Sequence, residues 1–377
     1  MWTSLCRNLQ TIQILSLDPL PVTCYNYNIN YKRRKEMTIT DNDIQAALAA
    51  FGMNDDITGK SELLRYDCKP EELSEREFKL ILRLDLAGRT PVVLKICGGD
   101  ERDAEDVVES MCRFSETLRE NGFETPRHYM SGGKFAITRE FDGCPLTVTL
   151  EDFVENEIKR VNAHTAYLTG RQLARTHDIS EKNDCHVKNE VIFDFFAAND
   201  LFDVGEFRGL TERMPEKEKE RAVKLIRFAD EIYAKLDPIR SRPRYAVQGD
   251  ISDCNTYLTP DRNIGFFDYN CAGENILFAA AVMQGWFEAH LMDYGTELTD
   301  EMSDRIEREF FRGYREVRPF TDEETAVLPG MYALISAFAK GNNRYAMTNA
   351  VKEQDAAKID ELLDIMEREI PADRNIL

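Results

Sequence analysis

The sequence predicts an α+β protein built from two parts, a small antiparallel sheet followed by a larger, mostly helical region. The chain has 377 residues, more than one hydrophobic core usually serves, so two compact parts are expected. Strand-like segments cluster before residue 142, whereas helical periodicity dominates from residue 163 onward. We therefore expect one domain over residues 37–140 and a second over residues 141–377.

The composition limits the classes of partner. The net charge of −20 argues against nucleic acid and anionic membranes and is compatible with a cationic small substrate. Hydrophobic residues make up 43% of the chain, enough for a core, yet no run approaches the ~20 apolar residues of a membrane span. The nine cysteines are scattered without C-x-x-C spacing, which is typical of reduced thiols in a cytoplasmic protein.

Residues 1–36 differ from the rest of the chain. They carry five Lys and Arg against two Asp and Glu, whereas the remainder holds 43 against 66. They lack the apolar core and cleavage site of a signal peptide. Met37 is followed by the helix-starting sequence TITD. We therefore expect residues 1–36 to be a disordered tail or the product of an upstream start.

The sheet region begins with a short helix and three strands. Residues 41–51 predict an amphipathic helix with Asp41 or Asp43 as its N-cap. The strands are expected at Glu62–Cys68, Arg76–Leu86 and Thr90–Cys97, and the second alternates as a half-buried strand does. In the third strand Lys95 interrupts an apolar run. It either needs an anionic partner or faces solvent from an edge strand.

A long helix over Glu101–Asn121 follows, and then a hairpin and further helices. The hairpin strands are expected at 127–130 and 134–141, turned by Ser-Gly-Gly. His177, at the expected end of a helix, is interpreted as structural, capping carbonyls or anchoring a loop. Thr321 and Glu324 have capping-box spacing. The later helices are expected over 163–177, 216–237, 276–291, 301–317, 322–340 and 351–369.

The stretch of residues 245–270 carries the chemistry. It predicts a strand, a loop that opens at Gly249, and a hairpin of two short strands. Phosphoryl transfer needs a carboxylate near the attacking hydroxyl and hard oxygen ligands for Mg²⁺. Asp250 in the loop is therefore the expected base. Asn255 at the end of the loop and Asp268 after the last strand are the expected metal ligands.

This stretch resembles the aminoglycoside phosphotransferase and choline kinase-like family. The family pattern is His-Gly-Asp, four residues, Asn, and an aspartate thirteen residues further on; here Gln248 replaces the histidine. The resemblance covers about residues 63–291. It implies a two-lobed protein kinase-like fold, with a small antiparallel-sheet lobe and a mostly helical lobe. It also implies a monomer that transfers the γ-phosphoryl group of ATP, with Mg²⁺, to a hydroxyl of a small molecule.

The resemblance also implies nucleotide-binding residues. Lys95 would contact the α- and β-phosphates and pair with a helix glutamate, for which Glu109 is the first choice and Glu105 the second. Residues 135–143 resemble the last small-lobe strand entering the hinge between the lobes. The main-chain groups that would bind adenine there belong to Arg139, Glu140 and Phe141. Residues 68–75, where protein kinases place a glycine-rich loop, contain no glycine.

Two departures from the family pattern leave alternatives open. Besides Gln248, Ala280 lies on the helix where family members carry an aspartate, and both positions concern loop anchoring rather than chemistry. The first alternative is a catalytically weak nucleotide-binding sensor or scaffold. The second is transfer of a nucleotide, which no sequence feature favours. The aromatic and acidic residues that either line an acceptor pocket or belong to the core are Trp286, Glu288, Tyr294 and Tyr332.

Overall fold

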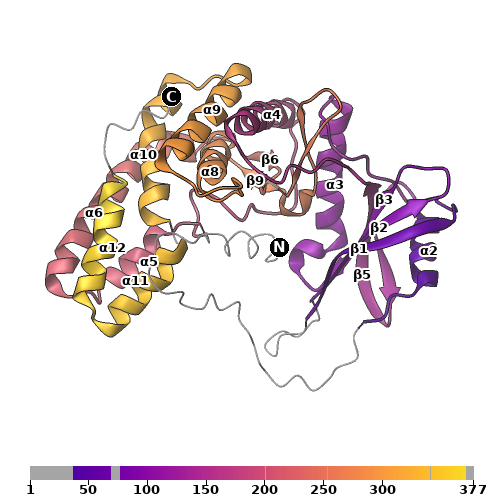
Figure 1. The fold of residues 1–377 in the computed structure, drawn as a ribbon, viewed down its shortest axis with the longest axis horizontal. Coiled ribbons are helices and arrows are strands. Elements are labelled where there is room, and N and C mark those ends of the chain that lie inside the picture. The colour runs from indigo at the N-terminus through magenta and orange to yellow at the C-terminus, as the bar shows by residue number, and fades with distance from the viewer. Residues whose placement is uncertain (1–36, 69–76, 200, 253, 340, 371–377) are drawn as a thin grey trace. The chain divides into compact units, whose positions relative to one another are not determined.

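The computed structural model describes residues 37–68, 77–199, 201–252, 254–339 and 341–370, so the expected tail, residues 1–36, lies outside it (Figure 1). The chain divides into two compact units. The sheet unit holds the described residues up to Lys159 together with Cys185–Asn189 and Asp250–Ala272, and the helical unit holds the remainder. No helix in the described part of the chain combines the length and apolar character needed to cross a membrane.

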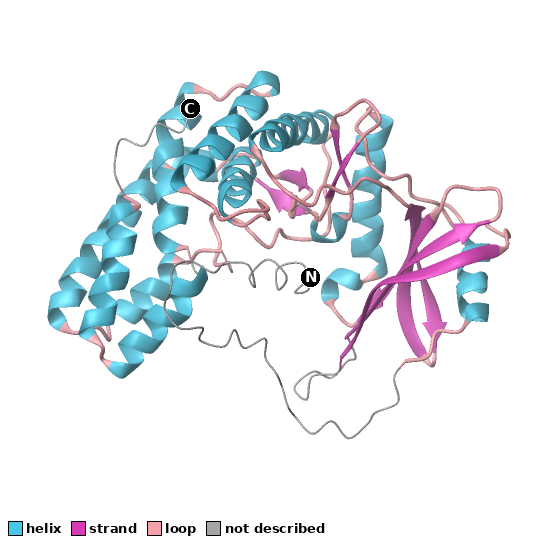
Figure 2. Cartoon of the chain, in the orientation of Figure 1, coloured by secondary structure: helices cyan, strands magenta, loops and turns pink. Residues whose placement is uncertain are grey.

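The sheet unit contains a five-stranded sheet in which every neighbouring pair is antiparallel (Figure 2). The predicted α+β class and antiparallel sheet are confirmed. The strand β3 that carries Lys95 is the middle strand, so the edge-strand alternative for this lysine is wrong. In spatial order the strands are β1 (Ile57–Cys68), β2 (Glu77–Leu86), β3 (Val92–Gly98), β5 (Cys144–Asp152) and β4 (Ala136–Phe141).

The strand β5 was missed by the sequence analysis. A tight turn at Asp142 and Gly143, with φ of 47° and 79°, returns the chain from β4 into β5. The expected domain boundary after residue 140 therefore falls inside a hairpin, and the compact unit continues to Lys159. The expected pairing of 127–130 with 134–141 is reduced to one bridge between Ser131 and Lys134, while His128 bridges to β5.

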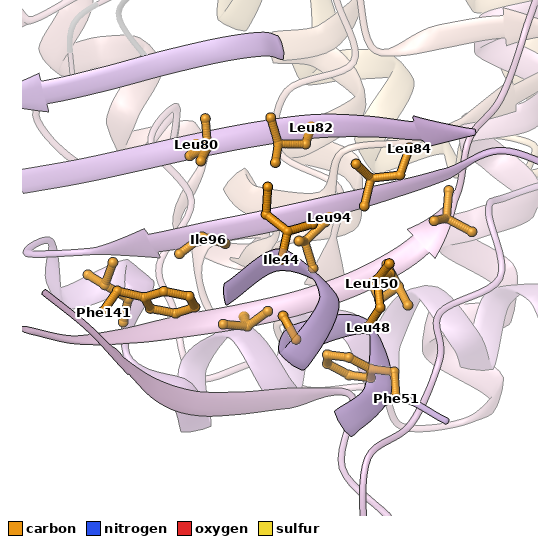
Figure 3. Close-up of a cluster of buried hydrophobic side chains, with 14 of the residues drawn as sticks. Ile44, Leu48, Phe51, Leu80, Leu82, Leu84, Leu94, Ile96, Phe141 and Leu150 are labelled. Atoms are coloured by element: carbon orange, nitrogen blue, oxygen red, sulfur yellow. The ribbon is translucent and has the colours of Figure 1, made fainter. Parts of the chain in front are cut away.

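The apolar face of the sheet packs on the helix α2 (Asp41–Ala50). The cap of this helix is Thr40 rather than Asp41 or Asp43, since the Thr40 hydroxyl accepts the Asp43 N–H at 3.2 Å. Asp43 is the reciprocal acidic partner of this capping box. Figure 3 shows Ile44 and Leu48 of α2 directed at the strands, where they meet Leu80, Leu82 and Leu84 of β2 and Leu94 of β3.

The opposite face of the sheet presents polar side chains. Because residues alternate along β2, Lys79 and Ile81 lie opposite the apolar face. The register pairs Ile81 with Lys95, and Lys95 with Thr149 of β5, so these residues share that face. The sheet unit also contains η1 (Glu101–Asp103), α3 (Glu105–Glu120), the hairpin of β7 (Thr256–Leu258) and β8 (Ile264–Phe266), and η2 (Tyr269–Cys271).

The helical unit is organised around a close contact between α4 (Ala163–Lys182) and α9 (Asp300–Val317). A Cβ at Gly170 would lie 2.1 Å from the Phe310 carbonyl oxygen, and a Cβ at Gly313 would lie 2.0 Å from the Tyr167 carbonyl oxygen. Glycine at both positions is what allows the two helices to approach this closely.

The remaining elements of the helical unit follow the expected order. The predicted capping box of α10 is present, and β6 pairs with β9. The expected last helix, 351–369, starts later, because Gln354, with φ of 57°, precedes Asp355, which caps α12; the helix before it, α11, was not expected. These elements are α5 (Val204–Thr211), α6 (Glu216–Lys235), α7 (Asp237–Arg240), β6 (Tyr245–Val247), β9 (Gly273–Asn275), α8 (Leu277–His290), α10 (Asp322–Phe338), α11 (Gly341–Glu353) and α12 (Ala356–Arg368).

Candidate functional site

Asp250 and Asn255 are joined by hydrogen bonds ahead of the β7–β8 hairpin. The Asn255 side-chain nitrogen donates to the carbonyl oxygen and to Oδ2 of Asp250, at 2.8 Å and 3.1 Å. Asn255 immediately precedes β7, and its carbonyl oxygen accepts the N–H of Phe267 at 3.1 Å. Phe267 is the residue before Asp268. The hairpin therefore brings the three predicted residues of this stretch to one end.

Lys95 reaches this cluster from the sheet. Its Nζ lies 3.0 Å from Oδ1 of Asp268, a residue 173 positions away in the sequence, and 2.9 Å from Oε1 of Glu151. Burial opposes a positive charge here, but the carboxylates of Asp268 and Glu151 outweigh it and raise the pKa of Lys95 above its ordinary value. The lysine is therefore a fixed cation beside the predicted metal ligand.

The expected pairing of Lys95 with Glu109 or Glu105 is wrong. Oε2 of Glu109 accepts the N–H groups of Phe135 and Ala136 at 2.7 Å and 2.8 Å. Glu105 binds the Lys134 ammonium at 2.5 Å and the N–H of Thr138 at 2.8 Å. Both glutamates lie on α3 and hold β4 and its leading turn against that helix. The strand β5 supplies the glutamate that pairs with Lys95 instead.

A chain of alternating charges continues from Glu151 towards α3. Nε2 of His128 lies 3.0 Å from Oε2 of Glu151, and its Nδ1 lies 3.4 Å from Oε1 of Glu116. Glu116 also accepts the backbone N–H of His128 at 2.5 Å and binds Arg119 at 2.7 Å. The buried imidazole therefore links the carboxylate that holds Lys95 to a carboxylate on α3.

This arrangement fixes the ionisation of its members. Burial disfavours both carboxylates, but Lys95 and His128 lower the pKa of Glu151 to about 2, and His128 and Arg119 lower that of Glu116 to about 2. Burial also disfavours a charged His128, yet Cys112 and the two glutamates that face the ring raise its pKa well above the usual value. The chain of charges is therefore complete near neutral pH.

Sequence reasoning missed Glu151 and His128. The pattern of residues 146–151, in which Leu, Val and Leu alternate with Thr, Thr and Glu, is a strand signal that could have revealed β5. With β5 paired to β3, Glu151 falls two residues beyond Thr149, the partner of Lys95. A lone histidine such as His128 carries no comparable signal.

The residues expected to form the hinge, Arg139–Phe141, do not connect the two units. These residues lie in β4, an edge strand paired with β5, and Phe141 is buried in the apolar core. The chain leaves the sheet after β5 ends at Asp152, because Asp142 and Gly143 form a hairpin turn rather than a connection between the units. The main-chain groups of Arg139, Glu140 and Phe141 are thus part of a hairpin.

The donor set at the hairpin suits Mg²⁺. Asn255 uses its side-chain nitrogen on Asp250, which leaves its amide oxygen as the ligand atom, and Asp268 contributes a carboxylate. Carboxylate and amide oxygens are the ligands that this cation prefers. The described residues contain no group of three or more His, Cys, Asp or Glu arranged for a metal. Residues here thus fit a cation whose remaining ligands are phosphate oxygens and water.

The residues of the helical unit that the sequence analysis named are buried or packed against other side chains of that unit. His177 lies inside α4, which continues to Lys182, and its Nδ1 is 2.8 Å from the Tyr314 hydroxyl. Gln248, in place of the family histidine, is buried, and Ala280 packs on a small apolar cluster. Trp286 is buried, donates to Ser336 at 2.9 Å and stacks on His290. This favours the core interpretation over an acceptor pocket.

Comparison with solved structures identifies the fold. The chain is similar to a microcompartment-associated aminopropanol kinase, with 18% identity, a TM-score of 0.55, and coverage of 87% of this chain and 96% of that one. An amicoumacin kinase in complex with AMP-PNP and Ca²⁺ has 14% identity and a TM-score of 0.50 over 88% of this chain and 95% of that one. The aminoglycoside phosphotransferase of Alicyclobacillus acidocaldarius has 12% identity and a TM-score of 0.50 over 90% and 98%.

These likenesses confirm the protein kinase-like fold shared by small-molecule kinases. Comparisons of sequence match only a small part of the chain. No family model matches the chain. An uncharacterised protein of Deinococcus radiodurans is 35% identical over 89 residues, which are 23% of this chain and 24% of that protein. The chain therefore matches about a quarter of the length of this relative.

Proposed function

We propose that this chain is an ATP- and Mg²⁺-dependent phosphotransferase that acts on a hydroxyl of a small molecule. One observation carries the proposal. Lys95, from the middle strand of the sheet, is ion-paired with Asp268 at the end of the β7–β8 hairpin. At the same end of the hairpin, Asn255 is hydrogen-bonded to Asp250. A cation, a base and two oxygen ligands are the parts that phosphoryl transfer needs.

The four residues divide the work of the proposed reaction. Asp250 accepts the proton of the acceptor hydroxyl, and Asn255 orients the Asp250 carboxylate through the bond of 3.1 Å. Lys95 neutralises phosphate charge, and Asn255 and Asp268 hold the cation. Bound Mg²⁺–ATP supplies the γ-phosphoryl group and a cation that offsets charge on the phosphates. The acceptor oxygen bonds to the γ-phosphorus as the bond to the β-phosphate oxygen breaks, so the products are a phosphate ester, ADP and a proton.

Two observations bear on the class of acceptor. The acidic balance of the chain, −20 overall, favours an acceptor that carries an amine. The name of one structural neighbour, an aminopropanol kinase, describes an acceptor with both an amine and a hydroxyl. Hydroxylated amines are therefore the first compounds to screen, in the cytoplasmic setting that the reduced cysteines favour.

Thermal unfolding of the full chain with and without ATP and MgCl₂ tests the nucleotide site. A ligand at ~100 times its Kd adds about 2.7 kcal/mol to the free energy of unfolding, which raises the melting temperature by several degrees. We expect such a rise with both ligands present and its loss with EDTA or in Asp268→Ala. Unchanged melting of the wild-type chain at millimolar ATP and Mg²⁺ would contradict the proposal.

A sensor or scaffold of the same fold is the second candidate, favoured by the replacement of the family histidine with Gln248. It shares the nucleotide site but not the turnover. Binding of ATP and Mg²⁺ without phosphorylation of any hydroxylated compound, at a range of pH values, would support the sensor. Formation of a phosphate ester would exclude it.

A further inference from the structure

Lys79 is a half-buried cation near Lys95 to which the proposed mechanism assigns no role. On the polar face of the sheet it pairs in register with Cys97, which lies two residues beyond Lys95 on β3. Such diagonal neighbours lie about 7–8 Å apart, within reach of long side chains. Both lysines and Asp268 line one pocket that is open to solvent.

The two lysines differ in their partners. Lys95 is held between Glu151 and Asp268 at 2.9 Å and 3.0 Å. Within the part of the chain that the structure describes, Lys79 has no carboxylate at ion-pair distance and feels Asp103 and Asp268 only from further away. Burial opposes its charge, but the more distant carboxylates outweigh burial and raise the pKa of Lys79, so the side chain is a cation with no direct ion pair among the described residues for a bound anion to displace.

A third cation lines the pocket but is already engaged. Arg102 of η1 has its Nε and Nη2 3.4 Å from the Asp100 carboxylate, and its backbone N–H donates to the same side chain at 2.9 Å. Lys79 is therefore the cation of this pocket whose ammonium group is available to a ligand.

The sequence before β2 gives a reason for a second cation. Glycine-rich loops bind phosphates through backbone N–H groups, because no side chain blocks the approach. Residues 68–75 contain no glycine, and one of them, Pro70, has no N–H. Lys79, close to the start of β2, can supply positive charge to a nucleotide at this sheet.

We propose that Lys79 is a second phosphate-binding residue, which contacts the phosphates of the nucleotide from β2 while Lys95 contacts them from β3. The inference rests on the proposed function, since it takes ATP as the anion. The inference predicts that Lys79 contributes to the binding free energy of ATP only through the phosphates. Adenosine, which lacks them, should bind independently of this residue.

Calorimetric titration of the full chain with ATP and with adenosine, both in MgCl₂, tests the inference. We expect Lys79→Met to weaken ATP binding about 10- to 100-fold, the usual loss for a charge-assisted hydrogen bond, with adenosine binding unchanged within about twofold. Lys79→Arg should recover most of the ATP affinity. The control is Lys60→Met, which removes the same charge from an exposed position on β1 where the lysine pairs with Asp41.

The outcomes separate the two proposals. If the wild-type chain binds ATP and Lys79→Met binds it equally well, or loses ATP and adenosine affinity by the same factor, the assignment of Lys79 is overturned and the proposed function stands. If the wild-type chain binds ATP no better than adenosine, the proposed function fails, and the role of Lys79 fails with it. Melting of the unliganded variants at the wild-type temperature verifies that Lys79→Met leaves the fold intact.

Discussion

Two buried histidines, one in each unit, have opposite surroundings. His128 of the sheet unit lies between the carboxylates of Glu116 and Glu151, and these charges favour its protonated form. His177 of the helical unit lies in an apolar helix contact with the Tyr314 hydroxyl at 2.8 Å, and burial, aided by Arg318, lowers its pKa well below the usual value. The charged His128 is thus part of the ion-pair network that holds Lys95, whereas the neutral His177 packs between helices.

This difference follows from the groups that surround each histidine. The sheet unit buries a row of ions that ends at the predicted phosphate-binding lysine, whereas His177 lies where α4 and α9 pack through glycines and makes a neutral hydrogen bond to Tyr314. Buried ions add little net stability unless every member is paired, so a complete row beside a pocket points to function. The position of a histidine in the sequence, at a helix end or near a motif, would have favoured His177 rather than His128 as the functional residue.

The largest effect should come from the centre of the charged row. Glu151→Gln leaves Lys95 with one carboxylate and His128 with another, and we expect a loss of about 3–5 kcal/mol in the free energy of unfolding. Urea unfolding measures it. Glu105→Gln is the control, because that glutamate lies on α3 outside the charged row, is only half-buried and pairs with the exposed Lys134. A loss under about 1 kcal/mol for Glu151→Gln would mean that the row is not a coupled network.

The two histidines should then differ in a direct comparison. His128→Gln removes a cation that faces two buried carboxylates, and we expect a cost of about 2–4 kcal/mol. His177→Gln removes one neutral hydrogen bond, for which about 0.5–1.5 kcal/mol is typical. Denaturant unfolding of both variants at pH 7 gives the two values. Equal losses would remove the distinction between the histidines.

The pH dependence of these two losses should have opposite sign. The raised pKa of His128 means that its stabilising contribution is complete below about pH 6.5 and declines as the pH rises towards its folded-state pKa. The lowered pKa of His177 means that stability falls below about pH 6.5, where the unfolded chain takes up a proton that the folded chain does not. Unfolding of the wild type and both variants between pH 5 and pH 9 separates these trends. Parallel profiles would contradict the assigned ionisation states.

The smallest effect is expected from the partner of the neutral histidine. Tyr314→Phe removes the hydroxyl bonded to His177 but keeps the buried ring, so we expect a loss of about 1 kcal/mol. Nucleotide affinity should not change. Thermal unfolding with and without ATP measures both quantities, and a loss above about 3 kcal/mol would show that this contact has a larger role than packing.

The residues near each other in the sequence were the ones that the sequence could predict. Asp250, Asn255 and Asp268 lie within one loop and hairpin, where spacing fixes geometry, and the structure brings them together. The role of Lys95 as a partnered lysine was also foreseeable, because a lysine inside an apolar strand needs an anion. The partner was not, since it depends on which strand lies beside β3.

The errors arose from long-range pairing. The turn at Asp142 and Gly143 reads equally well as a connection between domains and as a hairpin, and the first interpretation removed β5 and with it Glu151. The glutamates of α3 are the expected partners of Lys95, but Glu105 and Glu109 bind β4 and the residue before it. Local periodicity carries no information about strand order.

The central claim is that Asp250 acts on an acceptor hydroxyl while Lys95, Asn255 and Asp268 serve the phosphates and metal. Asp250→Asn separates these roles, because it keeps the shape of the side chain and removes the base. We would measure ADP release by the full chain with Mg²⁺–ATP and pools of hydroxylated amines. The prediction is acceptor-dependent release by the wild type, a fall of about 100-fold or more in Asp250→Asn, and unchanged ATP affinity in that variant. Equal release by both proteins, or none from a wild type that binds Mg²⁺–ATP, would contradict it.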